Sequence, residues 1–245
     1  MIRLITFDVN RTLLRLTASH PGEVYACIAA KYGYQCDPLV LGTAFRESYK
    51  TQSVESPTFG SGREDWKDWW RRVVLNTLKS SGVDINRNHL HAIAEDSLEI
   101  YAHAPAYTAL PYAQETLQCL SDKRIALGVI SNTDPRIKQV LLEHGFAKYF
   151  NFVLDSYSAG ISKPHLGIFK QSLSISQLAD LKPCEVLHVG DSLQMDYLGA
   201  RKAGMQSTLV SPDFREQCSQ HGFPVDNSSM FGSLKELVPQ LLSIC

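Results

Sequence analysis

Short, continuous apolar runs near both ends of the chain indicate buried β-strands. Runs of this kind, rich in Ile, Val, Leu and Phe and without polar alternation, are typical of parallel strands that are covered on both faces. They occupy Ile2–Phe7, Ile125–Ile130, Phe152–Leu154 and Val186–Val189, with a fifth at Thr208–Val210. We expect these segments to form one sheet.

Helical patterns separate the later runs. Apolar positions recur with helical spacing in Ala113–Leu120, Pro135–Glu143, Ile168–Leu173 and Tyr197–Ala203. Gly145 and Gly204 stand where a helix commonly places a left-handed terminal residue. Strands that alternate with helices predict an α/β fold, here a Rossmann-like parallel sheet with right-handed crossovers.

The interval from Leu16 to Ala104 breaks this rhythm. It contains no convincing strand, and helical spacing recurs in Glu23–Tyr32, Leu39–Tyr49, Asp65–Leu78 and His89–Tyr101. We therefore predict an α/β core of residues 1–15 and 106–245, with an inserted α-helical cap domain of residues 16–105. A β-sheet within residues 20–100 would contradict this division.

Two stretches inside the insertion have a distinct composition. Ser53–Gly62 is rich in small and polar residues and predicts a loop. Just after it, Trp66, Trp69 and Trp70 recur with Val73 at helical spacing. We expect this aromatic stripe to pack in the interior of the helical region rather than to form a cage for a ligand.

Composition and charge narrow the classes of partner. Of the 245 residues, 44% are hydrophobic and 20% are charged, and 24 Lys and Arg face 25 Asp and Glu. The formal net charge of −1 creates no overall field that would attract nucleic acid or an acidic membrane. Any feature that binds phosphate must therefore be local.

Cysteine spacing and hydropathy point to a reducing compartment. No two cysteines form a CxxC pair; they are Cys27, Cys36, Cys119, Cys184, Cys218 and Cys245. No stretch approaches the ~18 apolar residues of a membrane span, and no secretory apolar region precedes Asp8. We expect a cytoplasmic protein, with a nuclear location also open, and the sequence leaves the oligomeric state open.

Polar side chains follow the predicted strands where each one ends. Asp8, Ser131 and Asp191 come directly after apolar runs, and Lys163 lies in the loop after Phe152–Leu154. Ligands of open parallel sheets bind beyond the carboxyl ends of the strands, so these groups should meet at one edge. Two carboxylates, a hydroxyl and an ammonium group suit phosphoryl transfer.

Each of these groups can be assigned a role in that chemistry. Asp8 can be both the nucleophile and a Mg²⁺ ligand, and Asp191 can supply a second metal carboxylate. Lys163 and the Ser131 hydroxyl would hold the phosphoryl oxygens, where negative charge accumulates. Asp196 could orient metal-bound water.

Four ordered motifs resemble those of the haloacid dehalogenase superfamily. They are Asp8-Val9-Asn10-Arg11-Thr12, Val129-Ile130-Ser131-Asn132, Lys163-Pro164 and Gly190-Asp191-Ser192-Leu193-Gln194-Met195-Asp196. The resemblance implies a hydrolase with a Mg²⁺ cofactor, a small, phosphorylated substrate and a helical cap. It also implies that the Asn10 carbonyl binds the metal ion, and that Thr12 and Asn132 join Ser131 and Lys163 in binding substrate.

One position departs from the pattern of the family's phosphatases. Those enzymes have a second aspartate two residues after the nucleophile, and this chain has Asn10. An amide can neither protonate the leaving group nor take a proton from the attacking water. General acid–base catalysis of this kind contributes ~10²–10⁴-fold to the rate. We therefore expect the metal site to persist and phosphatase efficiency to be weakened.

Three functional hypotheses remain open at this point. The first is a Mg²⁺-dependent hydrolase that forms a covalent intermediate at Asp8. The second is a pseudoenzyme that binds Mg²⁺ and a ligand or protein but turns over negligibly because of Asn10. The third is a metal-free dehalogenase that attacks carbon with Asp8. Asp191 counts against this hypothesis, because such an enzyme has no use for a second metal-binding carboxylate.

Overall fold

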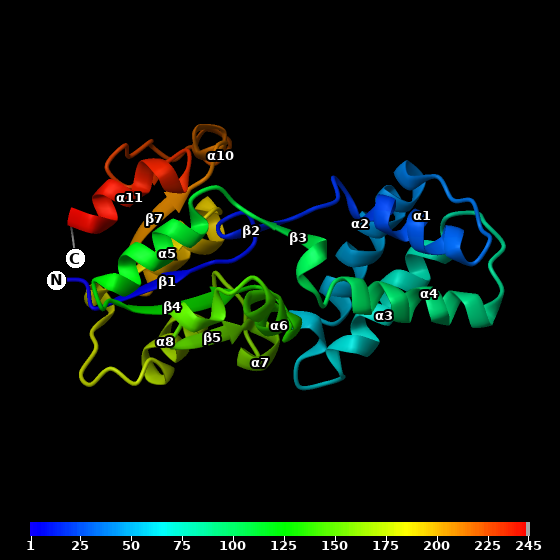
Figure 1. Ribbon diagram of the computed structural model, residues 1–245, viewed down its shortest axis with the longest axis horizontal. Coiled ribbons are helices and arrows are strands. Elements are labelled where there is room, and N and C mark those ends of the chain that lie inside the picture. The colour runs from blue at the N-terminus through cyan, green and yellow to red at the C-terminus, as the bar shows by residue number, and fades with distance from the viewer. Residues whose placement is uncertain (244–245) are drawn as a thin grey trace.

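A computed structural model describes residues 1–243, without the side chain of Leu242, and Cys245 lies outside the described residues. It contains a six-stranded sheet in the order β5-β4-β1-β6-β7-β8, in which all neighbouring strands are parallel. The strands are β1 (Leu4–Phe7), β4 (Ala126–Ser131), β5 (Phe152–Asp155), β6 (Val186–Gly190), β7 (Gln206–Val210) and β8 (Met230–Phe231). The predicted α/β class is confirmed (Figure 1).

Helices cover both faces of this sheet because side chains alternate along each strand. Ile5 and Phe7 pack in the cluster that includes α5 (Ala113–Asp122), α6 (Arg136–Glu143) and α11 (Leu234–Ser243). Leu4 faces the opposite side, against α8 (Leu166–Ile175) and α9 (Gly199–Lys202). The remaining helices of the core are α7 (Ser156–Ala159), α10 (Phe214–Gln220), the π-helix η5 (Leu193–Leu198) and the short helices η3 (Ala147–Tyr149) and η4 (Pro183–Glu185).

The insertion after the first strand is helical, as predicted. Its elements are α1 (Pro21–Lys31), α2 (Pro38–Glu55), η1 (Thr58–Gly60), α3 (Trp66–Lys79), α4 (Arg87–Ile100) and η2 (Ala104–Ala106). Apolar side chains such as Tyr25, Ile28, Val74 and Ile93 form its interior. This helical cap extends from one end of the core (Figure 1).

The prediction of a loop over Ser53–Gly62 is partly wrong. Helix α2 continues through Glu55 and ends at Ser56, whose backbone N–H donates to the carbonyl of Gln52. Pro57 gives the reason for this end, because the residue before a proline is disfavoured in helical conformation. Composition alone placed the boundary a turn too early.

Three short strands were not predicted. β2 (Leu14–Leu16) and β3 (Tyr107–Ala109) form an antiparallel pair that joins the core to the cap, and β8 completes the edge of the main sheet (Figure 1). Each is too short to display a pattern of alternation. The helix predicted at Tyr197–Ala203 also begins earlier, as the π-helix at Leu193.

A histidine in the second connection contacts both parts of the molecule. The Nδ1 atom of His103 lies 2.7 Å from the Glu143 carboxylate of α6, and its Nε2 atom lies 2.9 Å from Glu99 of α4. Hydrogen bonds to Glu143 and, second, to Glu99 raise the pKa of His103. The connection is thus held from the core and from the cap.

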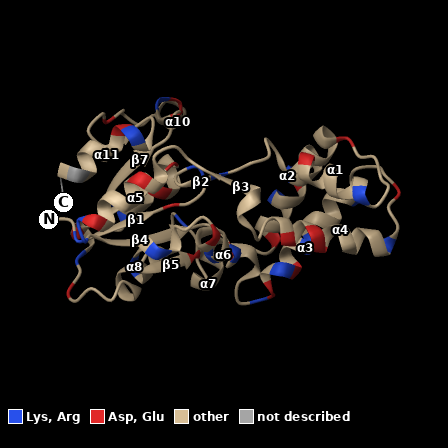
Figure 2. Ribbon diagram, in the orientation of Figure 1, with Lys and Arg blue, Asp and Glu red and all other residues tan. Residues whose placement is uncertain are grey.

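Charged side chains are distributed over both parts of the described chain. Lys and Arg (blue) and Asp and Glu (red) occur on both the core and the cap (Figure 2). This mixture agrees with the small net charge of the sequence. No helix in the described residues combines the length and the apolar character that crossing a bilayer requires.

Replacing Gly22 by alanine should destabilise the cap. The added Cβ atom would lie 2.0 Å from the carbonyl oxygen of Pro38 and 2.5 Å from the backbone nitrogen of Gly42, so α1 and α2 would have to separate. We expect a loss of about 1–3 kcal/mol in the free energy of unfolding, as in other overpacked interiors. Urea unfolding followed by tryptophan fluorescence measures it in the cap, because all 3 tryptophans of the chain lie in α3.

Gly62→Ala is a suitable control for this substitution. Nothing lies within 4 Å of the Cβ atom that it would add, although the residue has a φ of +73°. Only the cost of a left-handed alanine, about 1 kcal/mol, is therefore expected. A greater loss in Gly62→Ala than in Gly22→Ala would contradict the close contact between α1 and α2.

Candidate active site

The carboxyl ends of three adjacent strands bring the predicted site residues together. Asp8 follows β1, Ser131 is the last residue of β4, and Asp191 follows β6. Because β1 lies between β4 and β6 in a parallel sheet, these residues lie at the same edge. Lys163 arrives from the loop between α7 and α8.

The ammonium group of Lys163 lies at the centre of this site. Its Nζ atom donates to Asp8 Oδ1 at 2.7 Å, to Asp196 Oδ1 at 2.6 Å and to the carbonyl oxygen of Ile130 at 2.8 Å. Its three N–H bonds therefore all have acceptors. The lysine side chain is only 2% exposed, so these contacts hold a buried positive charge between two buried carboxylates.

One oxygen of Asp8 has two donors and the other has none. Oδ1 accepts from Lys163 and, at 3.1 Å, from the hydroxyl group of Ser131. Within the part of the chain that the structure describes, no group donates a hydrogen bond to Oδ2. Asp8 thus has a fixed orientation and one carboxylate oxygen free for chemistry.

Asn132 positions the lysine through its backbone. The Asn132 side-chain carbonyl accepts from the backbone N–H of Lys163 at 2.7 Å, and its amide donates to the Lys163 carbonyl at 2.9 Å. This pair of bonds fixes the loop that carries the ammonium group. The structure therefore gives Asn132 a contact with Lys163, while its predicted contact with substrate stays a prediction.

Besides Lys163, Asp196 is held by a histidine outside the motifs and by a backbone N–H group within the fourth motif. Its Oδ1 atom lies 3.0 Å from Nε2 of His188, whose Nδ1 atom lies 2.9 Å from the hydroxyl group of Thr6. The backbone N–H of Ser192 donates to Oδ2 at 3.0 Å. His188 is buried and both of its ring nitrogens are hydrogen-bonded, and its contact with Asp196 could not be inferred from one sequence.

A glycine makes room for Asp196. A Cβ atom on Gly190 would lie 2.2 Å from the Asp196 carboxyl carbon, so no larger residue fits between β6 and this side chain. The close approach explains why a glycine ends a strand that is otherwise apolar. It also fixes Asp196 beside the strand ends.

The carboxylates of the site form a cluster with an excess of negative charge. One oxygen atom from each of Asp8, Asp191 and Asp196 lies within 4.8 Å of the others. Arg11, which the sequence did not single out as a site residue, lies with Nε 3.4 Å from Asp191, and it also contacts Asp213 at 3.2 Å. The Arg11 side chain is 60% exposed, so its charge offsets the cluster only weakly.

Burial and mutual repulsion shift the pKa values within this cluster. Burial, followed by repulsion from Asp8 and Asp196, raises the pKa of Asp191 to about 7. Burial likewise raises the pKa of Asp8, against the opposing effect of Lys163. Because the pKa of Asp191 is raised in the folded state, its ionisation destabilises the folded protein as pH increases toward 7, unless a cation compensates.

Lys163 and Asp196 are shifted in the opposite sense by their contacts. Burial alone would lower the pKa of Lys163, but the Asp196 and Asp8 carboxylates outweigh it and raise that pKa. Burial alone would raise the pKa of Asp196, but Lys163 and His188 lower it. Both groups are therefore charged near neutral pH and form a stable ion pair.

Two predicted residues stand apart from this network. Thr12 is fully buried, and its hydroxyl group has no hydrogen-bond partner among the described residues. Asn10 is exposed and lines a cavity of about 670 Å³ between the core and the cap. Neither side chain hydrogen-bonds to Asp8, so their predicted roles in binding substrate and metal stay predictions.

Comparisons with known proteins identify the family of the chain. The family model described as haloacid dehalogenase-like hydrolase matches residues 2–204. The chain belongs to this hydrolase family. It is 34% identical over 244 residues to haloacid dehalogenase-like hydrolase domain-containing protein 3 of Xenopus laevis, with 99% of this chain and 97% of the relative covered.

Solved structures of haloacid dehalogenase-like proteins share the fold over nearly the whole chain. A 2-haloacid dehalogenase from Pseudomonas syringae pv. Tomato DC3000 superimposes with a TM-score of 0.65 at 25% identity, covering 100% of this chain and 99% of the other. The magnesium-bound HAD-hydrolase YfnB from Bacillus subtilis superimposes with a TM-score of 0.63 at 18% identity, covering 98% and 99%. The second likeness is one of fold alone.

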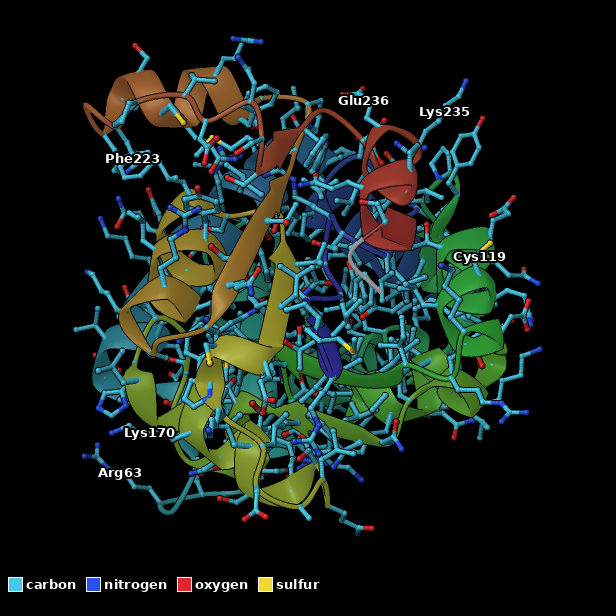
Figure 3. All side chains as sticks on the ribbon, turned by 90° about the vertical axis from the view of Figure 1, so that its left-hand side faces the viewer. Arg63, Cys119, Lys170, Phe223, Lys235 and Glu236 are labelled. Atoms are coloured by element: carbon cyan, nitrogen blue, oxygen red, sulfur yellow. The ribbon has the colours of Figure 1, made fainter. Side chains whose placement is uncertain are left out.

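Removing the Lys163 ammonium group should strongly destabilise the core. Lys163→Met leaves the Asp8 and Asp196 carboxylates buried without their cation, which typically costs about 3–5 kcal/mol. Circular dichroism during urea unfolding at pH 7.5 measures the loss. Lys170→Met is the control, because Lys170 is exposed and projects from the surface of α8 (Figure 3).

The deficit of the Lys163→Met variant should decrease at lower pH. Without the lysine, the pKa of Asp8 rises further, since Lys163 is the main group that lowers it. A carboxyl with a raised pKa in the folded state favours folding when protonated and disfavours it when ionised. A deficit that is equal at pH 5 and pH 7.5 would argue against the ion pair as the cause.

Proposed function

We propose that this protein is a Mg²⁺-dependent hydrolase that transfers the phosphoryl group of a small, phosphorylated molecule first to Asp8 and then to water. The observation that carries the proposal is the arrangement of Asp8, which has one oxygen bound by Lys163 and Ser131 and the other free. A nucleophilic carboxylate needs this orientation, and it needs positive charge nearby to approach an anion. Membership of the hydrolase family supports the same reading.

The residues present fit a divalent cation. Asp8 and Asp191 would hold Mg²⁺ together with the carbonyl oxygen of Asn10, while Asp196 completes the oxygen-rich cluster. Burial, followed by repulsion from Asp8 and Asp196, raises the pKa of Asp191, so a cation beside it would favour its ionised form. When bound, the cation would offset the repulsion between the carboxylate and the phosphoryl oxygens. The magnesium bound by the structurally similar YfnB is in keeping with this assignment.

The side chains of this chain would divide the work of the first step. A bond forms between an Asp8 oxygen and phosphorus, and the bond from phosphorus to the leaving oxygen breaks. Lys163 and Ser131 would hold the phosphoryl oxygens, which requires the ammonium group to share its bonds between Asp8 and substrate. Thr12 and Asn132 are assigned to the same binding site by their place in the motifs.

Position 10 limits this chemistry. The leaving oxygen gains a proton in the first step, and water must lose one in the second. The amide of Asn10 can do neither, so the rate depends on how readily the leaving group departs. The helical cap, residues 16–105 by our division, would select the substrate, and we place this activity in the cytoplasm.

The main alternative is a pseudoenzyme that binds Mg²⁺ and a ligand or protein. Asn10 is the observation that favours it, because an amide cannot carry out the proton transfers that turnover needs. A metal-free dehalogenase is less consistent with the cluster of Asp8, Asp191 and Asp196, which concentrates charge that such a reaction does not use.

Mg²⁺ affinity should depend on Asp191. Losing a residue that only supports a metal ligand typically weakens metal binding by ~10-fold or more. Asp191 is proposed as a ligand itself, so we expect Asp191→Asn to weaken Mg²⁺ binding by more than ~10-fold. Isothermal titration calorimetry with MgCl₂ measures this. Asp213→Asn is the matched control, because Asp213 also contacts Arg11 but lies outside the cluster of metal-ligating oxygens. Equal affinities in wild type and Asp191→Asn would refute the site.

Restoring a carboxylate at position 10 should increase turnover. With an activated aryl phosphate, wild type should release a burst of product equal to the enzyme concentration and then turn over slowly, since nothing at position 10 prepares the water. Asn10→Asp should raise the steady-state rate by roughly 10²-fold.

Asn10→Ala separates the effect of the carboxylate from that of merely changing the residue. Alanine cannot exchange a proton, so its steady-state rate should stay near that of wild type. If Asn10→Asp is folded and binds Mg²⁺ but gains no activity on any phosphate ester, the pseudoenzyme becomes the better description.

A further inference from the structure

The cavity between the core and the cap has a continuous wall of aromatic rings. Neighbouring rings in this wall have centroids 5.7–6.4 Å apart. In order, the aromatic wall consists of Tyr101, Tyr25, Phe45, Tyr49, Trp70 and Phe59. All of these residues belong to the inserted segment and line the cavity, Tyr25 and Phe59 with little exposed surface.

Trp70 is fixed in this wall by the core. Its indole N–H donates to Asp134 Oδ2 at 2.8 Å, and the Arg136 guanidinium group lies 5.0 Å from the centre of its ring. Asp134 follows Ser131 and Asn132 in the loop after β4. The ring is therefore held beside the strand ends that carry the candidate active site.

Trp69 and Trp70 are adjacent in α3 but differ in their exposure. Trp69 is 1% exposed and packs in the interior of the cap, as the sequence predicted for the whole stripe. Trp70 is half-buried: it packs against the same cluster and also lines the cavity. The predicted interior packing thus describes Trp69 fully and Trp70 in part.

The charges around the cavity indicate which kind of ligand the aromatic wall would accept. Aromatic walls bind flat rings, and they also bind cations. Three arginines line the cavity, and Asp134 is the single carboxylate among the described residues of its lining. Arg136 is bonded to Asp134, and Arg11 is paired with Asp191 and Asp213 outside the lining. Arg15 has no ion-pair partner within the described chain. A cationic ligand is therefore disfavoured.

We propose that the substrate is a phosphomonoester whose leaving group carries a flat aromatic ring system, uncharged or anionic, that packs against the aromatic wall. This inference rests on the proposed function for the position of the phosphoryl group at Asp8. Asn10 and Asn132 line the end of the cavity next to the strand ends, so phosphate and ring would be held from opposite sides. A volume of about 670 Å³ is within the range of sites for organic ligands of this size.

Binding of phosphonates, which cannot be hydrolysed, tests the inference apart from turnover. Isothermal titration calorimetry of the wild-type protein with Mg²⁺ would compare phenylphosphonate, 1-naphthylphosphonate and cyclohexylphosphonate. Apolar burial alone favours the cyclohexyl compound over the phenyl compound. Ring contacts should reverse that order by roughly 2-fold to 10-fold and make the naphthyl compound the tightest.

Two tryptophans in α3 provide a matched pair of variants. Trp66 and Trp70 both lie 5.0 Å from the Arg136 guanidinium group, but Trp66 does not line the cavity. Trp70→Leu should abolish the preference for aromatic phosphonates, and Trp66→Leu should keep it. Phe45→Leu, which removes a ring from the wall without removing a hydrogen bond, should reduce the preference if Trp70→Leu fails to fold.

The possible outcomes separate this inference from the proposed function. Equal binding of all three phosphonates, with no effect of Trp70→Leu, would overturn the aromatic substrate class and leave the phosphate site intact. Binding of 1-naphthol, lost in Trp70→Leu, with no phosphonate bound would support the aromatic class and overturn the phosphate site. Tighter binding of phosphocholine than of phenylphosphonate would show that the wall accepts cations, and it would overturn the inference, as would no binding of any probe.

Discussion

The structure of the site depends on one buried ammonium group placed between two carboxylates. Lys163 can remain charged in the interior only because Asp8 and Asp196 surround it, and each carboxylate is tolerable there only because of the lysine. Other residues serve to maintain this arrangement. Asn132 holds the lysine backbone, and Ser131 and His188 hold the two carboxylates. The result is a hydrogen-bonded network anchored on three neighbouring strands, which gives the Asp8 carboxylate a single orientation.

The two parts of the molecule meet different physical demands. Strand ends in a rigid parallel sheet place Asp8, Ser131 and Asp191 accurately, as polar chemistry requires. The cap presents broad aromatic surfaces, for which shape matters more than the position of a single atom. Trp70 and Asp134 link the two, so the apolar surface is aligned with the polar site by a direct hydrogen bond.

The sequence predicted those features that leave a local pattern. Apolar runs located five of the strands, and the polar residues directly after them, such as Asp8 and Ser131, identified the edge where the site forms. Patterns could not reveal β2, β3 or β8, because two or three residues are too few to show periodicity. They also could not reveal the bond between His188 and Asp196, or that Trp70 faces a cavity while Trp69 does not. Those facts depend on which segments meet in space, and a helical stripe does not specify what covers it.

The pair of strands β2 and β3 has a consequence for how the cap can move. The two connections are not independent tethers: they are joined by backbone hydrogen bonds in antiparallel register, and Thr17 adds a bond between its hydroxyl group and that of Thr108 at 3.0 Å. A ribbon of this kind resists shear within its own plane, because shear would break those bonds, and it yields more readily to bending out of the plane. Displacing the cap within that plane would cost these bonds, so the ribbon couples the two connections mechanically.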